Sequence, residues 1–340
     1  MLMNVTSLRT IILMCLLINV FSVYACTTVF SNATSKSLVV ARTMDLYISD
    51  LPLIIAEPRG TEHNGQTDKN SLQWRSKYGT TSVTALHGNT VTDGINEKGL
   101  AVHLLYLKNT QYPHYNDNRP KISNLMWAKY ILDNFSTVNE ALAGTKNLEI
   151  VATKLDGQVW PLHLTMEDAT GDSAVIEFIN GKMNVYHGHQ YQIMTNEPAY
   201  NIQLTNLKNY KGFGGNLPLP GDVDPISRFV RVAFFLKTLP KEIHFTQSVN
   251  DLLSVIRTAM VPFGAEEFSG SKESAWPTRW ITIADLTNKT YYFHSTSTPN
   301  VIWLDLNKIN FAFGAPILTI DPAKAHEGST LKKFMPTFDK

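Results

Sequence analysis

A cysteine at a processing site is the residue of this chain best suited to covalent chemistry. Thr10–Val20 is almost wholly apolar and has the length of a signal-peptide core. Val23 and Ala25 then stand at the −3 and −1 positions of a cleavage site, which makes Cys26 the first residue of the mature chain. The thiol and a free α-amine would then belong to one residue, as in an N-terminal nucleophile. We therefore expect a signal peptide at 1–25 and an exported protein, either periplasmic or secreted.

Two other interpretations of this cysteine stay open at this point. It can stand at the cleavage site by chance. Alternatively, Val23-Tyr24-Ala25-Cys26 loosely resembles a bacterial lipobox, in which the cysteine is acylated and anchors a lipoprotein that acts as a non-catalytic binding module. The anchor and the nucleophile exclude each other, because an acylated amine and a thioether can be neither base nor nucleophile.

Two charged residues are expected to lie beside Cys26. Residues 27–30 and 38–43 are β-branched or apolar runs separated by turn-forming residues, which predicts a hairpin. A hairpin returns the end of its second strand to the start of its first, and this brings Arg42 and Asp45 near the cysteine. Such a pair is commonly only a surface ion pair. Beside a thiol, however, a cation lowers the pKa below its free value of about 8.5 and favours the reactive thiolate.

The elements that must position these residues are mostly strands. Further strand patterns occur at 99–107, 160–167, 173–179, 192–195, 279–285 and 290–295. Helix starts are indicated at Ser123, Thr137, Asp224 and Ser248 by capping residues ahead of apolar positions at helical spacing. No linker, charge block or repeat divides residues 26–340. We therefore expect one α+β domain in which helices cover antiparallel sheets.

Composition restricts the possible partners. The chain has 340 residues with 30 Lys+Arg against 29 Asp+Glu, and 44% of its residues are apolar. Without a basic stripe to neutralise phosphates, nucleic-acid binding is not expected. The spacing of His187-Gly188-His189 is more typical of a turn than of a metal site. The expected partner is a small molecule.

Five short motifs in a fixed order support a more specific assignment. They follow Cys26 in the order Arg42-Thr43-Met44-Asp45, Asp93 to Leu100 (DGINEKGL), Thr195 to Pro198 (TNEP), Leu219 to Asp222 (LPGD) and Pro225 to Phe229 (PISRF). The pattern resembles the choloylglycine hydrolase family, that is, the bile salt hydrolases and penicillin V acylases of the N-terminal nucleophile hydrolase superfamily. The resemblance extends from Cys26 to about Val232 and more loosely beyond it.

The resemblance implies a role for each matching residue. Cys26 would be the nucleophile, Arg42 and Asp45 the charged pair around it, Asn196 the oxyanion-hole amide, Arg228 the arginine that completes the polar site, and Tyr106 the residue whose backbone N–H is the second oxyanion donor. Without the resemblance, Asn196 is interpreted as a turn residue, Arg228 as a helix residue pairing with Asp222 or Asp224, and Tyr106 as a core strand residue. The implied fold is the four-layer αββα sandwich.

The implied reaction is hydrolysis of a linear amide that joins an apolar acyl group to a small polar amine, with no metal or organic cofactor. Tyr106 stands where bile salt hydrolases commonly have Asn and penicillin V acylases commonly have Tyr. Asn196 and Arg228 are only 32 positions apart, so the assembly loop of the Gram-positive members is shortened. The chain thus resembles the exported Gram-negative branch, and a homo-oligomer remains possible.

Overall fold

The structure is a computed structural model that describes residues 26–34, 37–86, 88, 90–155, 157–240, 245–265, 276–325, 328–329 and 335–336. The expected signal peptide at 1–25 lies outside the described residues. Within the described residues, no helix is both long enough and apolar enough to cross a membrane.

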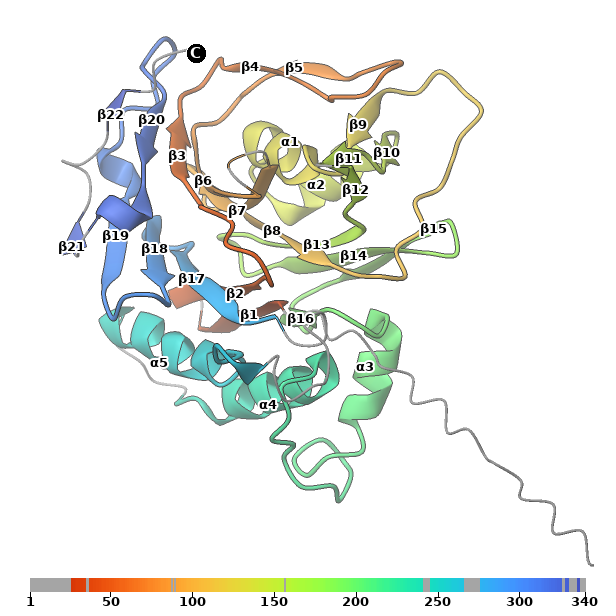
Figure 1. Cartoon of the computed structure of the whole chain (residues 1–340), viewed down its shortest axis with the longest axis vertical. Coiled ribbons are helices and arrows are strands. Elements are labelled where there is room, and N and C mark those ends of the chain that lie inside the picture. Colours follow the sequence, from red (N-terminus) through yellow and green to blue (C-terminus); the bar gives the residue numbers. More distant parts are fainter. Residues whose placement is uncertain are drawn as a thin grey trace, which may run out of the picture.

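Two sheets form the centre of the molecule (Figure 1). In the described part of the chain, the first sheet has seven strands, in the order β16 (Ile193–Thr195), β1 (Cys26–Thr34), β2 (Ser37–Asp45), β17 (Thr278–Asp285), β18 (Thr290–Ser295), β19 (Val301–Asp305) and β21 (Gly328–Ser329). Neighbouring strands are antiparallel, except that β19 and β21 are parallel. The expected hairpin is therefore β1–β2, at the centre of this sheet.

The second sheet is entirely antiparallel. Over the same described residues it has nine strands, in the order β15 (Lys182–His187), β14 (Ser173–Ile179), β13 (Leu162–Glu167), β8 (Ala101–Tyr106), β7 (Thr90–Asn96), β6 (Thr80–Ala85), β3 (Ile54–Glu57), β20 (Leu318–Ile320) and β22 (Met335–Pro336). Short pairs flank it: β9 (Lys121–Ser123) with β10 (Glu149–Val151), β11 (Lys154–Leu155) with β12 (Gln158–Val159), and β4 (Glu62–Asn64) with β5 (Gln73–Arg75).

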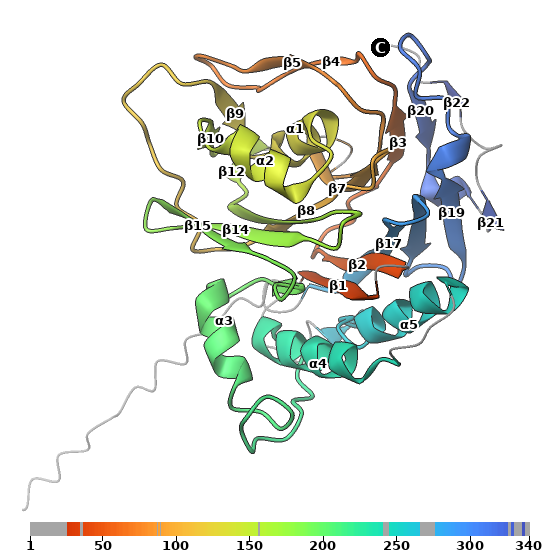
Figure 2. The ribbon, with the colours of Figure 1, turned by 180° about the vertical axis from the view of Figure 1, so that it is seen from behind.

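Helices cover the outer face of each sheet. Helices α1 (Trp127–Asn134) and α2 (Val138–Thr145) lie over the second sheet, whereas α4 (Pro225–Thr238) and α5 (Phe245–Arg257) lie under the first (Figures 1 and 2). Helix α3 (Tyr200–Leu207) packs beside α4. Two short 3-10 turns, η1 (Leu306–Lys308) and η2 (Pro322–Lys324), accompany the C-terminal strands. The order helix, sheet, sheet, helix confirms the four-layer αββα sandwich.

Burial on both faces of β2 determines the environment of the two charged residues. All nine residues of β2 are buried, whereas a strand with one solvated face alternates between buried and exposed positions. One face of β2 packs on α5. The other faces the second sheet, where Arg42 donates hydrogen bonds to the carbonyls of Thr92 and Leu104. Arg42 and Asp45 are therefore not a surface ion pair.

Two of the expected helix starts are confirmed. Thr137 caps α2 by accepting a hydrogen bond from the Glu140 N–H at 3.2 Å. Asp224 caps α4 by accepting one from the Ser227 N–H at 3.1 Å, with Pro225 at the first helical position. Both signals depend on contacts within one helical turn, which the sequence displays directly.

The other two expected helix starts are wrong. Ser123 ends β9, and α1 begins four residues later at Trp127, because the Ser123 hydroxyl accepts the Leu125 N–H in a turn instead of capping a helix. Ser248 lies inside α5, which already begins at Phe245.

Candidate active site

Cys26 is the first residue of β1 and is buried, with 4% of its surface exposed. In the β1–β2 ladder it pairs with Met44, and Thr28 pairs with Arg42. The Cys26 Sγ therefore lies 4.0 Å from Arg42 Nη2 and 3.9 Å from both Met44 Sδ and the Asp45 carbonyl. The hairpin brings the thiol, a cation and a carboxylate into one buried site.

The Arg42 guanidinium is held from several sides. It donates to the carbonyls of Thr92 and Leu104, each at 2.8 Å, and lies 5.1 Å from the centre of the Trp280 ring. Its Nη1 is 3.4 Å from Asp93 Oδ2. Because the donors and the planar group are fixed in this way, Nη2 is directed at the sulfur-containing side of the site.

Asp93 connects Arg42 to a polar network between the two sheets. Its Oδ2 is 2.5 Å from His103 Nδ1, and its Oδ1 accepts a hydrogen bond from the Tyr291 hydroxyl. His103 Nε2 is 3.3 Å from Glu167 Oε2. These groups are almost fully buried. The two carboxylates raise the pKa of His103 to about 9 even though burial opposes its charge, so the imidazole is cationic at neutral pH.

Asn196 follows β16 and bridges the two sheets. Its Oδ1 lies 2.6 Å from the Cys26 nitrogen and 3.1 Å from Arg228 Nη2, and both of these atoms donate. Because a guanidinium has no acceptor, the oxygen of the amide must face it. The Asn196 Nδ2 is thereby turned to the Tyr106 carbonyl at 2.7 Å, and within the described residues its second hydrogen has no acceptor.

Arg228, in the first turn of α4, joins that helix to the start of β1. It is fully buried, and its Nη1 donates to the Cys26 carbonyl at 2.8 Å and to Thr27 Oγ1 at 2.5 Å. The same nitrogen is 3.7 Å from Asp45 Oδ2. The guanidinium therefore contacts the site residues themselves, whereas the backbone N–H of Arg228 donates at 3.0 Å to the carbonyl of Asp224, which caps the helix.

The backbone of Tyr106 faces the same region. Leu107 donates to the Pro161 carbonyl, so the neighbouring pair of Tyr106 with Leu162 is a non-hydrogen-bonded pair of the β8–β13 ladder. In such a pair the N–H and the carbonyl both point away from the partner strand. On that other edge β8 pairs with β7 only as far as His103. The Tyr106 N–H consequently points to the edge where its carbonyl meets Asn196.

Burial dominates the ionisation of the two titratable groups nearest the sulfur. It raises the pKa of the Cys26 thiol, and Arg42 offsets only part of this effect. The expectation of a depressed thiol pKa in this chain is therefore wrong, because desolvation outweighs the cation. Burial likewise raises the pKa of Asp45 to about 7, against the opposing charge of Arg228.

Among the described residues, Asn196 and not Asp45 is hydrogen-bonded to the Cys26 nitrogen. The Asp45 Oδ2 accepts a hydrogen bond from Thr43 Oγ1 at 3.1 Å. The Asp45 carboxylate lies 3.7 Å from Arg228 Nη1, and its negative charge adds to the rise of the Cys26 pKa.

A small apolar cavity lies beside the thiol. Its volume is about 30 Å³, close to the share of one water molecule in the liquid. Tyr106 packs edge-on against two tryptophans in its wall, with ring centres 6.4 Å from Trp160 and 5.7 Å from Trp276. Sequence reasoning missed both tryptophans, because neither belongs to a motif and both approach Cys26 only through the fold. Other wall residues are Met44, Leu46, Leu86 and Leu162.

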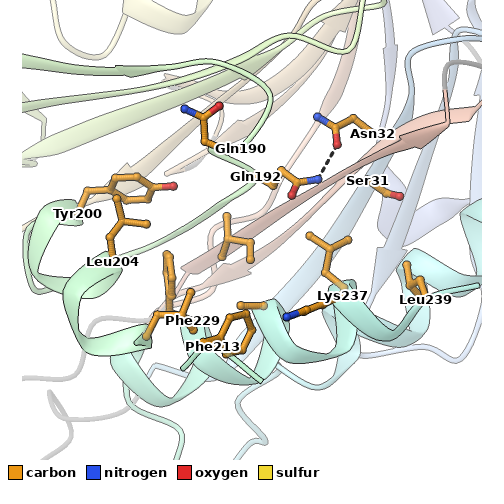
Figure 3. A pocket seen from close by; sticks show the side chains of 14 residues that line it. Ser31, Asn32, Gln190, Gln192, Tyr200, Leu204, Phe213, Phe229, Lys237 and Leu239 are labelled. Atoms are coloured by element: carbon orange, nitrogen blue, oxygen red, sulfur yellow. Dashed lines mark hydrogen bonds between the residues drawn. The ribbon is translucent and has the colours of Figure 1, made fainter. Parts of the chain in front are cut away.

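A much larger cavity lies elsewhere in the described residues. It has a volume of about 400 Å³ and is bounded by α3, α4, β16 and the far end of β1 (Figure 3). Cys26 starts β1, whereas Ser31 and Asn32 of the same strand line this cavity. Cavity size alone would therefore point to the end of the strand opposite Cys26.

One cluster has the composition of a metal site. Glu57, His63 and Asp133 direct ligand atoms to within 4.8 Å of one another. Lys129 already supplies the cation there, since its ammonium pairs with Glu57 and lies 2.7 Å from Asp133 Oδ1. The cluster is best described as a buried ion network.

Comparisons with known proteins agree with this geometry. Residues 26–319 match the family described as linear amide C–N hydrolases, choloylglycine hydrolase family. The chain is 36% identical over 296 residues to the penicillin V acylase of Pectobacterium atrosepticum, covering 81% of this chain and 78% of that protein. It is 26% identical over 301 residues to the bile salt hydrolase/transferase of Clostridium perfringens, covering 79% and 88%. The solved penicillin V acylase from Agrobacterium tumefaciens superimposes with a TM-score of 0.82 at 33% identity, covering 92% of this chain and 98% of that chain.

Proposed function

Since this chain belongs to the choloylglycine hydrolase family of linear amide C–N hydrolases, we propose that Cys26 performs the hydrolysis as an N-terminal nucleophile. The observation that carries the proposal is the position of Asn196. Through its two amide atoms, this side chain contacts the Cys26 nitrogen on one sheet and the Tyr106 carbonyl on the other. Asn196 thereby positions Cys26 next to two groups that can donate hydrogen bonds to an oxyanion, its own Nδ2 and the Tyr106 N–H.

The reaction proceeds in two displacements. The α-amine of Cys26 takes the thiol proton, and the sulfur attacks the amide carbonyl carbon. The resulting oxyanion accepts hydrogen bonds from Asn196 Nδ2 and the Tyr106 N–H. The ammonium then returns the proton to the leaving nitrogen, the C–N bond breaks, and an acyl-cysteine remains. In the second displacement the amine takes a proton from water, the hydroxide attacks the thioester, and the carboxylic acid and the thiol are released.

This mechanism requires removal of the preceding residues. In the full chain the Cys26 nitrogen belongs to the peptide bond with Ala25, and a peptide nitrogen is not a base. Cleavage after Ala25, as expected for an exported protein, would create the amine in place. Arg228 donates to the Cys26 carbonyl, and this nearby positive charge favours the neutral, basic form of the amine.

Burial also argues against the lipoprotein interpretation of Cys26. The residue is 4% exposed and lies against Met44 and Arg42. An anchored cysteine needs neither this burial nor the contact with Asn196.

The walls of the catalytic cavity favour an aryl-containing acyl group, as in penicillin V, over a steroid. Tyr106, Trp160 and Trp276 offer ring edges and faces to it, and such arrangements bind aromatic rings in edge-to-face geometry. Because the present volume is small, the wall side chains must change rotamer when the acyl group enters. The relative that is named a penicillin V acylase is also more similar, at 36% identity, than the one named a bile salt hydrolase/transferase, at 26%.

The test uses the mature protein with penicillin V, a glycine-conjugated bile salt and an acyl-homoserine lactone as substrates. We expect the highest kcat/KM for penicillin V, and an acyl adduct on Cys26 by intact mass after rapid acid quenching. Cys26→Ser should abolish turnover with the circular dichroism spectrum unchanged, since a hydroxyl is far harder to ionise. Turnover that survives this substitution would exclude Cys26 as the nucleophile.

A further inference from the structure

The cavity of about 400 Å³ between α3, α4 and β16 has the features of a second ligand site. Its volume falls within the range of roughly 300–1,000 Å³ of small-molecule pockets. Most of its wall is apolar, with Leu204 and Leu207 from α3 and Phe229, Ala233 and Leu236 from α4. The proposed hydrolysis at Cys26 leaves this space unused, because the cavity lies at the opposite end of β1.

A buried hydroxyl points into this cavity. Tyr200 is 1% exposed, and its hydroxyl extends from α3 toward the other lining side chains (Figure 3). Its ring contacts Tyr186, Tyr191 and Phe229, but among the described residues the hydroxyl has no hydrogen-bond partner. Because the hydroxyl can both donate and accept a hydrogen bond, a ligand in the cavity that carries a hydrogen-bonding oxygen could pair with it.

The other polar side chains of the wall differ in this respect. Gln192 donates to the Phe30 carbonyl and to Asn32 Oδ1 at 3.1 and 2.6 Å, and the second of these bonds is drawn in Figure 3. Asn32 in turn donates to the carbonyls of Gly171 and His189. These two amides are thus engaged in hydrogen bonds within the protein, whereas the Tyr200 hydroxyl makes none with the described residues.

A single charged side chain lines the described wall of the cavity. Lys237 is the only ionisable lining residue besides Tyr200 in the described wall, and it has no carboxylate among its lining neighbours. Its ammonium donates to the Gly212 carbonyl at 2.6 Å and lies 5.2 Å from the centre of the Phe213 ring. Two of its three hydrogens stay available for an anion.

The two polar side chains reach the cavity from different helices, Tyr200 from α3 and Lys237 from α4. The Tyr200 ring is 5.9 Å from Phe229, near the start of α4. Lys237 follows Phe229 by eight positions on the same helix, which at about 1.5 Å per residue places it about 12 Å further along the axis. Ala233 and Leu236, which also line the cavity, lie between Phe229 and Lys237 along α4.

From this arrangement we propose that the cavity binds a linear amphiphile whose anionic head, a carboxylate, meets Lys237 and whose distal oxygen meets the Tyr200 hydroxyl, with an apolar chain along α4. The ligand is thus an ω-oxygenated medium-chain carboxylate. The site does not depend on the hydrolytic reaction, and its test does not use turnover.

The test is isothermal titration of the purified protein with three probes below their micelle concentrations: 10-hydroxydecanoate, decanoate and decan-1-ol. We expect 10-hydroxydecanoate to bind with the lowest Kd, at one molecule per chain. Tyr200→Phe should weaken 10-hydroxydecanoate by about tenfold and leave decanoate nearly unchanged, because only the first probe bonds to the hydroxyl. Lys237→Gln should weaken both carboxylates by about threefold and leave decan-1-ol unchanged.

Matched controls use residues outside the wall. Tyr191→Phe removes the hydroxyl of a tyrosine that touches Tyr200 but does not line the cavity, and Lys182→Gln removes an exposed charge on β15. Neither should change binding. Ala233→Phe, which fills the cavity with a ring, should abolish binding of all three probes, with thermal unfolding used to confirm that the variant is folded.

Several results would overturn the proposal. If decanoate and decan-1-ol bind with equal affinity, the cavity does not recognise a carboxylate. If Tyr200→Phe still prefers 10-hydroxydecanoate over decanoate, the Tyr200 hydroxyl does not bind the distal oxygen. If no probe binds, and Ala233→Phe instead dissociates an oligomer in sedimentation velocity, the cavity is an interface between copies of this chain.

Discussion

Asp93 Oδ2 lies 2.5 Å from His103 Nδ1 in the dry layer between the two sheets. The same oxygen is 3.4 Å from Arg42 Nη1, so a single carboxylate holds both a buried imidazolium and the cation that faces the thiol. His103 in turn is held by Glu167. Through Asp93, the second sheet therefore positions a charge that acts on the nucleophile of the first.

Replacing Asp93 tests this positioning role. Asp93→Asn keeps the shape but removes the charge that holds Arg42, so the guanidinium should lose its fixed direction toward Cys26. We expect the pH at which Cys26 reacts with iodoacetamide to rise, and kcat to fall about tenfold with little change in KM. Asp168→Asn, a buried carboxylate that accepts the Val138 N–H instead, is the matched control. An unchanged alkylation profile in Asp93→Asn would show that Asp93 is only structural.

The raised pKa of His103 predicts a loss of stability at alkaline pH. The folded-state pKa is about 9 against an ordinary value of 6.5, so the folded protein binds a proton that the unfolded chain releases. The resulting stabilisation is fully present below pH 6.5 and is lost as the pH rises through 9. Between these values the free energy of unfolding should fall by about 1.4 kcal/mol per pH unit.

Urea unfolding at a series of pH values measures this slope. His103→Gln, which cannot take up the proton, should be less stable at pH 6 and should show a flatter pH dependence over the same range. A parallel slope in the variant would assign the pH dependence to other groups.

Replacing Asn196 distinguishes stabilisation of the oxyanion from stabilisation of the Cys26 thiolate. Asn196→Ala should lower kcat/KM by about a hundred- to a thousand-fold, because the Nδ2 meets charge only after the carbonyl has been attacked. It should leave the iodoacetamide profile of Cys26 nearly unchanged, whereas Arg42→Ala should shift that profile to higher pH. An equal shift in both variants would place Asn196 in the ground-state environment of the thiol.

Processing at Cys26 is the fourth prediction. Intact mass of the protein from its native host should show a chain that begins at an unmodified Cys26. Protein that keeps an initiator Met before Cys26 should be inactive, because its cysteine nitrogen stays in a peptide bond. Activity should appear when an aminopeptidase removes that Met. A diacylglyceryl adduct on the cysteine, or full activity with the Met in place, would contradict the mechanism.

Features that depend on neighbouring residues were predictable from the sequence. The β1–β2 hairpin, the caps at Thr137 and Asp224, and the limits of β14 and β18 all follow from contacts or alternation within a few positions. The order of the short motifs predicted the family, which the match over 26–319 confirms. Capping at Ser123 was wrong because its hydroxyl accepts the Leu125 N–H in a turn, and capping at Ser248 was wrong because α5 already begins three residues earlier, at Phe245.

The ionisation of the site was decided by the tertiary structure. Sequence reasoning placed Arg42 beside the thiol and therefore expected a lowered pKa. The stacking of the two sheets and α5 on β2 removes water from that strand, and the resulting desolvation raises the pKa of Cys26 instead.

The sequence by itself determined which residue can be the nucleophile and which strand carries its cation, because a cleavage site and a hairpin are local patterns. The tertiary structure alone decided what surrounds them. Asn196 is 170 positions from Cys26 and 90 from Tyr106, and Trp276 and Asp93 belong to segments equally remote from the thiol's own strand. Such contacts form only when the two sheets pack face to face. The burial of apolar area drives this packing, but the local sequence does not show which polar groups it will bring together.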